Sequence, residues 1–180
     1  MCYYVGTIIN RTRRVTMAQT GPLLLGNQEI NEVTTVKMHT LGAIAQTRDG
    51  RVYRYAKNGA TELAAGATFE KTDTADITGT LTSAQAKSDA VVTINKTVAE
   101  PAKFEDGILA IEKAKHLVSG AAKDGEVTLV DRLVSPAAAG ATAALSANQY
   151  CGVKAGTAKV IGTAEVKVPA NAYFWAFVSL

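Results

Sequence analysis

The stretch from His39 to Phe69 constrains the fold most, because two turn dipeptides interrupt segments whose apolar residues recur with a period of two. Asp49-Gly50 and Asn58-Gly59 are pairs that tight hairpins favour, since both central positions of such a turn must tolerate positive φ. Alternation with a period of two is typical of strands and not of helices. The stretch therefore predicts three consecutive antiparallel strands, over residues 41–45, 51–57 and 63–69.

The middle strand of this group has a basic and aromatic face. Alternation puts Tyr53 and Tyr55 on the same side as Arg51 and Lys57. Tyrosine and arginine are enriched where proteins contact each other. We therefore expect this face to be an outer contact surface, buried against another subunit, and not a reaction centre.

The rest of the chain adds short β-branched or alternating segments separated by turn residues. We expect further strands at 32–38, 89–98, 108–116, 126–133, 148–153, 158–168 and 172–178, one helical turn at 83–87, and a loop or short helix at 135–147. Many short strands with turns between them predict an all-β fold, a short-stranded antiparallel barrel or sandwich. Residues 32–180 are predicted to form a single β-rich domain.

Residues 1–31 are predicted to be a leader and an extended N-terminal arm. Leu23, Leu24 and Leu25 stand between Gly-Pro and Gly-Asn pairs, in a segment too short for a stable helix. These leucines would fill a groove on the same subunit or, as we prefer, on a neighbouring one. The apolar run near Met1 is too short to span a membrane, so no membrane partner is expected.

The net charge of +3 resides in the leader, whose Arg11, Arg13 and Arg14 have no acidic neighbour before residue 18. The remaining residues are neutral in sum. A nucleic-acid-binding protein normally carries a basic patch on its folded body, so we expect no nucleic acid partner.

Catalytic and metal-binding patterns are not apparent. His39 and His116 are the two histidines, and Cys2 and Cys151 the two cysteines, and none of the four forms a local motif with another. Metal motifs such as HExxH and the glycine-rich nucleotide loops are missing from the sequence. We therefore expect no enzymatic activity, no catalytic or metal-ligating residue and no cofactor, with both cysteines free.

A set of short motifs occurs in a fixed order along the chain. They are Thr40-Leu41-Gly42, Asp49-Gly50-Arg51-Val52-Tyr53-Arg54-Tyr55, Phe104-x-Asp106-Gly107, Asn148-x-Tyr150-x-Gly152, Gly162-Thr163-Ala164 and Tyr173-Phe174-Trp175. In this order they resemble a family of tailed-bacteriophage head proteins, described as decoration, cement or minor capsid proteins. The family pattern carries a proline where Gln149 stands here.

The resemblance implies a β-rich subunit, often trimeric, on the outside of the phage head. The expected partners are the major capsid protein and further copies of the chain, after synthesis in the host cytoplasm. The expected function is non-enzymatic stabilisation of the head lattice; the alternative is a receptor- or glycan-binding module of a head or tail fibre. The residues expected at contacts with the capsid or with other subunits are Leu23, Leu24, Leu25, Tyr53, Tyr55, Tyr173, Phe174 and Trp175.

Overall fold

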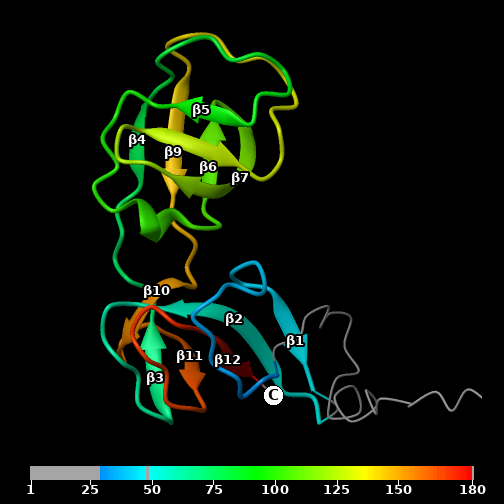
Figure 1. The fold of residues 1–180 in the computed structure, drawn as a ribbon, viewed down its shortest axis with the longest axis vertical. Coiled ribbons are helices and arrows are strands. Elements are labelled where there is room, and N and C mark those ends of the chain that lie inside the picture. Colours follow the sequence, from blue (N-terminus) through cyan, green and yellow to red (C-terminus); the bar gives the residue numbers. More distant parts are fainter. Residues whose placement is uncertain (1–28, 48, 180) are drawn as a thin grey trace, which may run out of the picture.

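The fold is known from a computed structural model, which describes residues 29–47 and 49–179. Its strands form two six-stranded sheets, and the one named helix among the described residues is the short 3₁₀ helix η2 (Pro101–Phe104). Figure 1 shows the sheets as two lobes arranged along the long axis of the molecule. The predicted all-β class is confirmed.

The first sheet closes into a barrel. Its strands are β1 (Ile44–Gln46), β2 (Val52–Asn58), β3 (Ala67–Glu70), β10 (Cys151–Ala155), β11 (Val160–Ala164) and β12 (Tyr173–Ser179). They follow the order β1-β2-β10-β3-β11-β12, and a further pairing of β12 with β2 closes a five-stranded ring with β1 outside it. Closure leaves no free edge within the ring, and β1 pairs with β2 alone.

The predicted hairpin around Asp49-Gly50 is confirmed. β1 and β2 pair antiparallel with Ala45 opposite Tyr53, and the amide of Gly50 donates to the carbonyl of Thr47 at 3.0 Å. Gly50 has φ of +90°, a conformation that glycine adopts without the steric cost of a Cβ atom.

The predicted three-strand meander is wrong at its third strand. β10 lies between β2 and β3, and β10 runs parallel to β2, with Cys151 opposite Lys57. Between Asn58 and the start of β3, Leu63 forms an isolated bridge with Val168. The interpretation failed because turn residues indicate where a strand ends but do not indicate which strand pairs next.

The second sheet is an insertion between β3 and β10. Its strands are β4 (Ile77–Thr80), β5 (Val91–Thr93), β6 (Ile108–Ile111), β7 (Ala114–Ala121), β8 (Glu126–Leu129) and β9 (Thr142–Ser146). They are antiparallel in the order β4-β9-β6-β7-β8-β5. A single bridge between Leu81 and Ile94 joins the two edges at one point, so the sheet is strongly curled.

Several local predictions within this sheet are wrong. The single strand expected over 108–116 is two strands, because Glu112 adopts φ of +53° and reverses the chain. The alanine-rich segment 135–147, expected to be a loop or helix, contains β9, which pairs on both sides. Residues 83–87 form no helical turn, and Gln85 instead bridges Ala137. Non-local pairing overrode local propensity in the last two cases.

The strand expected over 32–38 is also wrong. Within this range only Thr34 makes a β-bridge, with Tyr173 at the start of β12. The predicted N-terminal arm lies almost wholly outside the described residues, which begin at Glu29.

Each sheet surrounds its own hydrophobic cluster. The barrel cluster includes Trp175, Phe69 and Phe174, and the cluster of the inserted sheet includes Phe104 and Leu109. The β-rich domain predicted over 32–180 therefore contains two cores, connected by residues 71–76 and 147–150 (Figure 1).

Candidate functional site

The aromatic residues expected at contacts with other proteins lie in the core of this chain. Tyr55 and Phe174 are 0% exposed, Tyr53 and Trp175 are 1% exposed, and Tyr173 is 7% exposed. The prediction that these side chains form an outer face is therefore corrected. Alternation grouped Tyr53 and Tyr55 correctly, but the barrel closes around that face, because β2 pairs with both β10 and β12.

The hydroxyl groups of the three tyrosines have specific partners. Tyr53 donates to Glu165 at 2.8 Å, Tyr173 donates to the carboxylate of Glu105 at 3.0 Å, and Tyr55 accepts a hydrogen bond from the amide of Met38 at 3.1 Å. Burial and the bond to Glu165 raise the pKa of Tyr53 to about 12. These contacts make the tyrosines structural residues of the barrel.

Leu23, Leu24 and Leu25 lie outside the described residues. Their predicted place in an arm that contacts a neighbouring subunit stays a prediction.

A polar junction connects the two lobes. The turn after η2 supplies Glu105 and Asp106, whose carboxylates reach the barrel. Lys57 Nζ lies 2.6 Å from Glu105 Oε2, and Lys37 Nζ lies 2.7 Å from Asp106 Oδ2. Asp106, 4% exposed, also accepts the amide of Leu41 at 2.7 Å. Every one of these contacts crosses from the insertion to the barrel, so the junction fixes one lobe to the other.

The charges of the junction stabilise each other. Burial alone would raise the pKa of Glu105, but the hydrogen bond and charge of Lys57, with Tyr173 and Lys37, outweigh it and hold that pKa below its usual range. Burial alone would lower the pKa of Lys57, but Glu105 and Tyr173 raise it above its usual range. Both groups are ionised at neutral pH, as expected of a structural ion pair.

The outer face of the inserted sheet carries a row of aliphatic side chains, which we call the aliphatic row. It consists of Ile108 on β6, Leu117 on β7 and Val130 after β8. Ile108 is opposite Leu117, and the amide of Val130 donates to the carbonyl of Leu117 at 2.8 Å. Ile108 is 43% exposed, Val130 is 57% exposed and Leu117 is half-buried. On β5, next to β8, Val91 is 42% exposed and extends this face.

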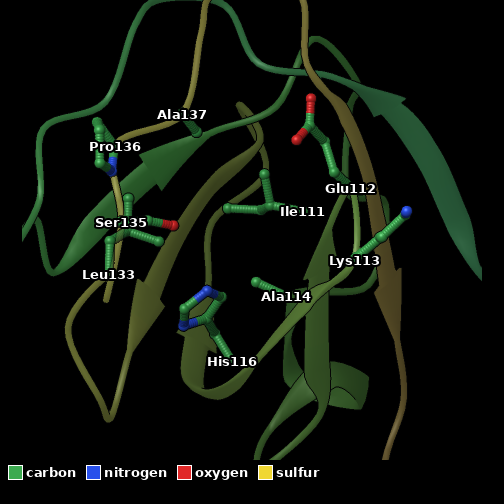
Figure 2. A pocket seen from close by; sticks show the side chains of 9 residues that line it. All are labelled: Ile111, Glu112, Lys113, Ala114, His116, Leu133, Ser135, Pro136 and Ala137. Carbon is green, nitrogen blue, oxygen red and sulfur yellow. The ribbon is translucent and has the colours of Figure 1, made fainter.

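A pocket of about 460 Å³ lies between the β6–β7 hairpin and the segment 133–137. Its lining residues are Ile111, Glu112, Lys113, Ala114, His116, Leu133, Ser135, Pro136 and Ala137. Figure 2 shows the ring of His116 at one side, with one ring nitrogen directed into the space between Leu133 and Ala114. The hydroxyl of Ser135 is directed into the same space, whereas the charged ends of Glu112 and Lys113 point away from His116.

His116 is the buried polar residue of this pocket. Its side chain is 3% exposed, and its Nδ1 has no hydrogen-bond partner. The nearest carboxylate oxygen, Oδ2 of Asp131, is 3.6 Å from Nδ1, which is too long for a hydrogen bond. Buried polar groups without a partner are rare in folded proteins and call for an explanation.

The other histidine and the described cysteine have structural environments. His39 packs against Trp175 at 5.0 Å between ring centroids, and burial lowers the pKa of His39. The thiol of Cys151 is buried and free, and burial raises its pKa to about 11. A thiol with a raised pKa is a poor nucleophile at neutral pH.

Among residues 29–47 and 49–179, no group of three or more histidine, cysteine or acidic side chains is arranged to hold a metal ion. No helix in the same part of the chain is long and apolar enough to cross a membrane.

Comparison of the chain with protein-family models, with curated proteins and with solved structures gave no match.

Sequence reasoning did not identify the aliphatic row or the pocket. The row has only a weak signal, because Ile108 and Val130 are single aliphatic residues within two predicted strands. The pocket has none, because its two sides, 111–116 and 133–137, come together only through the curling of the sheet.

Proposed function

We propose that this chain is a non-enzymatic structural protein of a phage virion, which binds the outer surface of the head and stabilises the capsid lattice. The observation that carries the proposal is the aliphatic row, Ile108, Leu117 and Val130, which lies uncovered on the outer face of the inserted sheet. Adjacent exposed aliphatic side chains on a soluble domain mark surfaces that other proteins cover.

The two-lobed architecture supports the proposal. The junction through Glu105 and Asp106 holds the inserted sheet on the barrel, so the lobes can present two surfaces in a fixed relation. A cement protein acts by burying surface across the boundary between capsid subunits. Several weak contacts made at once give persistent attachment, because each contact raises the effective concentration of the next. The partners in this proposal are the major capsid protein and other copies of the chain, assembled as a homotrimer.

The proposal is tested by adding purified protein to heads assembled without it. Val130→Glu places a charge in the aliphatic row and should weaken attachment by about tenfold or more, because a desolvated contact would then contain an unpaired charge. Val160→Glu is the matched control, since Val160 is 47% exposed on β11 of the barrel. Equal occupancy by wild type and V130E would rule out the row as the capsid contact.

The arm is tested separately by deleting residues 1–31. We expect the truncated protein to occupy fewer sites on empty heads than the full chain. Full occupancy by the truncated form would show that Leu23, Leu24 and Leu25 are not part of the contact.

The second candidate is a receptor- or glycan-binding module of a head or tail fibre. The pocket that contains His116 favours it, because a lattice contact does not require a concave site with a buried polar group. Copy number separates the two candidates. A decoration protein is present in hundreds of copies in a purified virion and a fibre module in a handful.

A further inference from the structure

The pocket between the β6–β7 hairpin and the segment 133–137 has the size and lining of a small-molecule site. Its volume of about 460 Å³ falls in the range of about 300–1,000 Å³ that such sites occupy. The aliphatic and small side chains of Ile111, Ala114, Leu133 and Pro136 form its apolar walls. His116 and Ser135 supply polar groups directed inward (Figure 2).

His116 indicates that the pocket receives a polar partner. One nitrogen of this buried ring is directed into the pocket (Figure 2), so a ligand there would meet a polar group beside the apolar walls. The carboxylate of Asp131 accepts the amide of Leu117 at 3.0 Å and stands 3.6 Å from Nδ1. A ligand hydroxyl can both donate and accept a hydrogen bond, so it suits the imidazole nitrogen that faces the pocket.

The side chains that face the inside of the pocket favour an uncharged ligand. The charged ends of Glu112 and Lys113 point away from His116 (Figure 2), so the space beside the ring is bounded by polar and apolar groups. A ligand that matches an imidazole and a serine hydroxyl on apolar walls has hydroxyl groups on a compact carbon frame.

We propose that this pocket binds an uncharged, polyhydroxylated small molecule, of the class of a monosaccharide unit. One ligand hydroxyl forms a hydrogen bond with the imidazole of His116, a second pairs with Ser135, and the carbon frame packs on Ile111 and Leu133. This inference does not depend on attachment to a capsid, because the pocket and the aliphatic row are tested by different measurements.

The test is a titration of the ¹⁵N-labelled full chain, followed by two-dimensional NMR. The probes are D-glucose, D-galactose and N-acetyl-D-glucosamine, with sodium phosphate and methylammonium chloride as charged probes. We expect saturable shifts of amides in 111–116 and 133–137 with at least one sugar, at about millimolar affinity. Saturable binding of phosphate or methylammonium in place of the sugars, or no saturable shift in these segments, would overturn the proposal.

Two variants assign the binding to the pocket. Ser135→Trp fills the pocket from an exposed position and should weaken sugar binding by about tenfold or more, whereas Ser83→Trp, on an exposed serine elsewhere, should leave it unchanged. His116→Phe keeps the ring and removes both nitrogens, and should also weaken binding. Because His116 is buried, S135W decides the outcome if H116F does not fold. Unchanged affinity in S135W would place the binding elsewhere and contradict the proposal.

Discussion

Individual residues of the barrel show that alternation grouped the aromatic side chains correctly but that they lie in the core and not on an outer face. Tyr53, Tyr55 and Trp175 belong to one packed aromatic group, in which Tyr55 lies 5.1 Å from Trp175 between ring centroids. Large aromatic side chains supply much of the apolar area that a core buries. This chain has one tryptophan and four phenylalanines. It therefore places Tyr53, Tyr55 and Tyr173 in the core as well, with their hydroxyl groups paired at the margin.

Trp175 offers a direct test of this assignment, because it is the single tryptophan of the chain. We expect the isolated protein to show a blue-shifted emission that iodide barely quenches, since the indole is 1% exposed. Denaturation should shift the emission to the red and restore quenching. The assignment would be contradicted if the native isolated protein showed a red-shifted emission that iodide quenches and that only attachment to heads protects. Trp175 would then lie at an interface.

Gly125, in the turn between β7 and β8, tests how tightly the inserted sheet is packed. A Cβ atom there would clash with the carbonyl oxygen of Ile94, and φ is +89°. We expect Gly125→Ala to lower the free energy of unfolding by about 3 kcal/mol, from backbone strain and displacement of the chain after β5.

Gly140→Ala is the matched control for this contact. Gly140 also has a positive φ, of +80°, but nothing lies within 4 Å of the position of its Cβ atom. This variant should lose only the strain contribution, about 1 kcal/mol. Urea denaturation of both variants measures the difference, and equal losses would show that the approach to Ile94 does not constrain the turn.

One short segment, η2 and the turn after it, connects the elements of the two lobes. η2 and the turn after it belong to the insertion by sequence, yet their acidic residues pair with Lys57 on β2 and with Lys37. The side-chain amide of Asn148 donates from Nδ2 to the carbonyls of Leu41 and Asp106, at 3.1 Å and 3.0 Å, so the returning segment takes part as well. A network in which every member has a partner specifies one arrangement of the elements that it connects.

The junction makes stability depend on pH in a defined direction. The pKa of Glu105 is lower in the folded chain than its ordinary value of 4.5. Its contribution is therefore fully present above pH 4.5 and is lost as the pH falls through the lower, folded value. Glu105→Gln should lower the free energy of unfolding by about 1–3 kcal/mol at pH 7. The further decrease in this free energy between pH 7 and acid pH should be smaller in the variant than in the wild type.

Glu62→Gln is the control for the loss of an acidic side chain. Glu62 pairs with Lys167 at 3.1 Å, but its side chain is 52% exposed, and exposed pairs contribute about 0–1 kcal/mol. Thermal unfolding of both variants from pH 7 down to pH 3 makes the comparison. An acid profile of E105Q that matches the wild type would exclude Glu105 as the source of the dependence.

At the scale of the whole molecule, the insertion enters and leaves the barrel between neighbouring strands. Glu70, the last residue of β3, is opposite Lys154 of β10, and the hydroxyl of Thr72 donates to the carbonyl of Gly152. The two ends of the insertion are therefore held close together by the barrel. The barrel cluster contains no residue of the inserted sheet.

This arrangement predicts that the barrel folds without the insertion. Replacing residues 74–146 with a short glycine-containing linker should leave the blue-shifted emission of Trp175 in place, because β3 and β10 would form an ordinary hairpin. The variant should lose attachment to heads together with the aliphatic row. An unfolded product would show that the junction, and not the barrel core, stabilises the first lobe. Circular dichroism and tryptophan fluorescence distinguish these outcomes.

The sequence alone determined the all-β class, the hairpin at Asp49-Gly50 and the grouping of Tyr53 with Tyr55. These features depend on local rules, because φ preferences and alternation act over a few residues. The tertiary structure decided which face of β2 is inside, that β10 enters between β2 and β3, and that the chain builds two cores. Those outcomes depend on pairings between strands many residues apart, which local patterns do not encode. The pocket at His116 and the aliphatic row arise from the same long-range pairings and could not be read from either segment by itself.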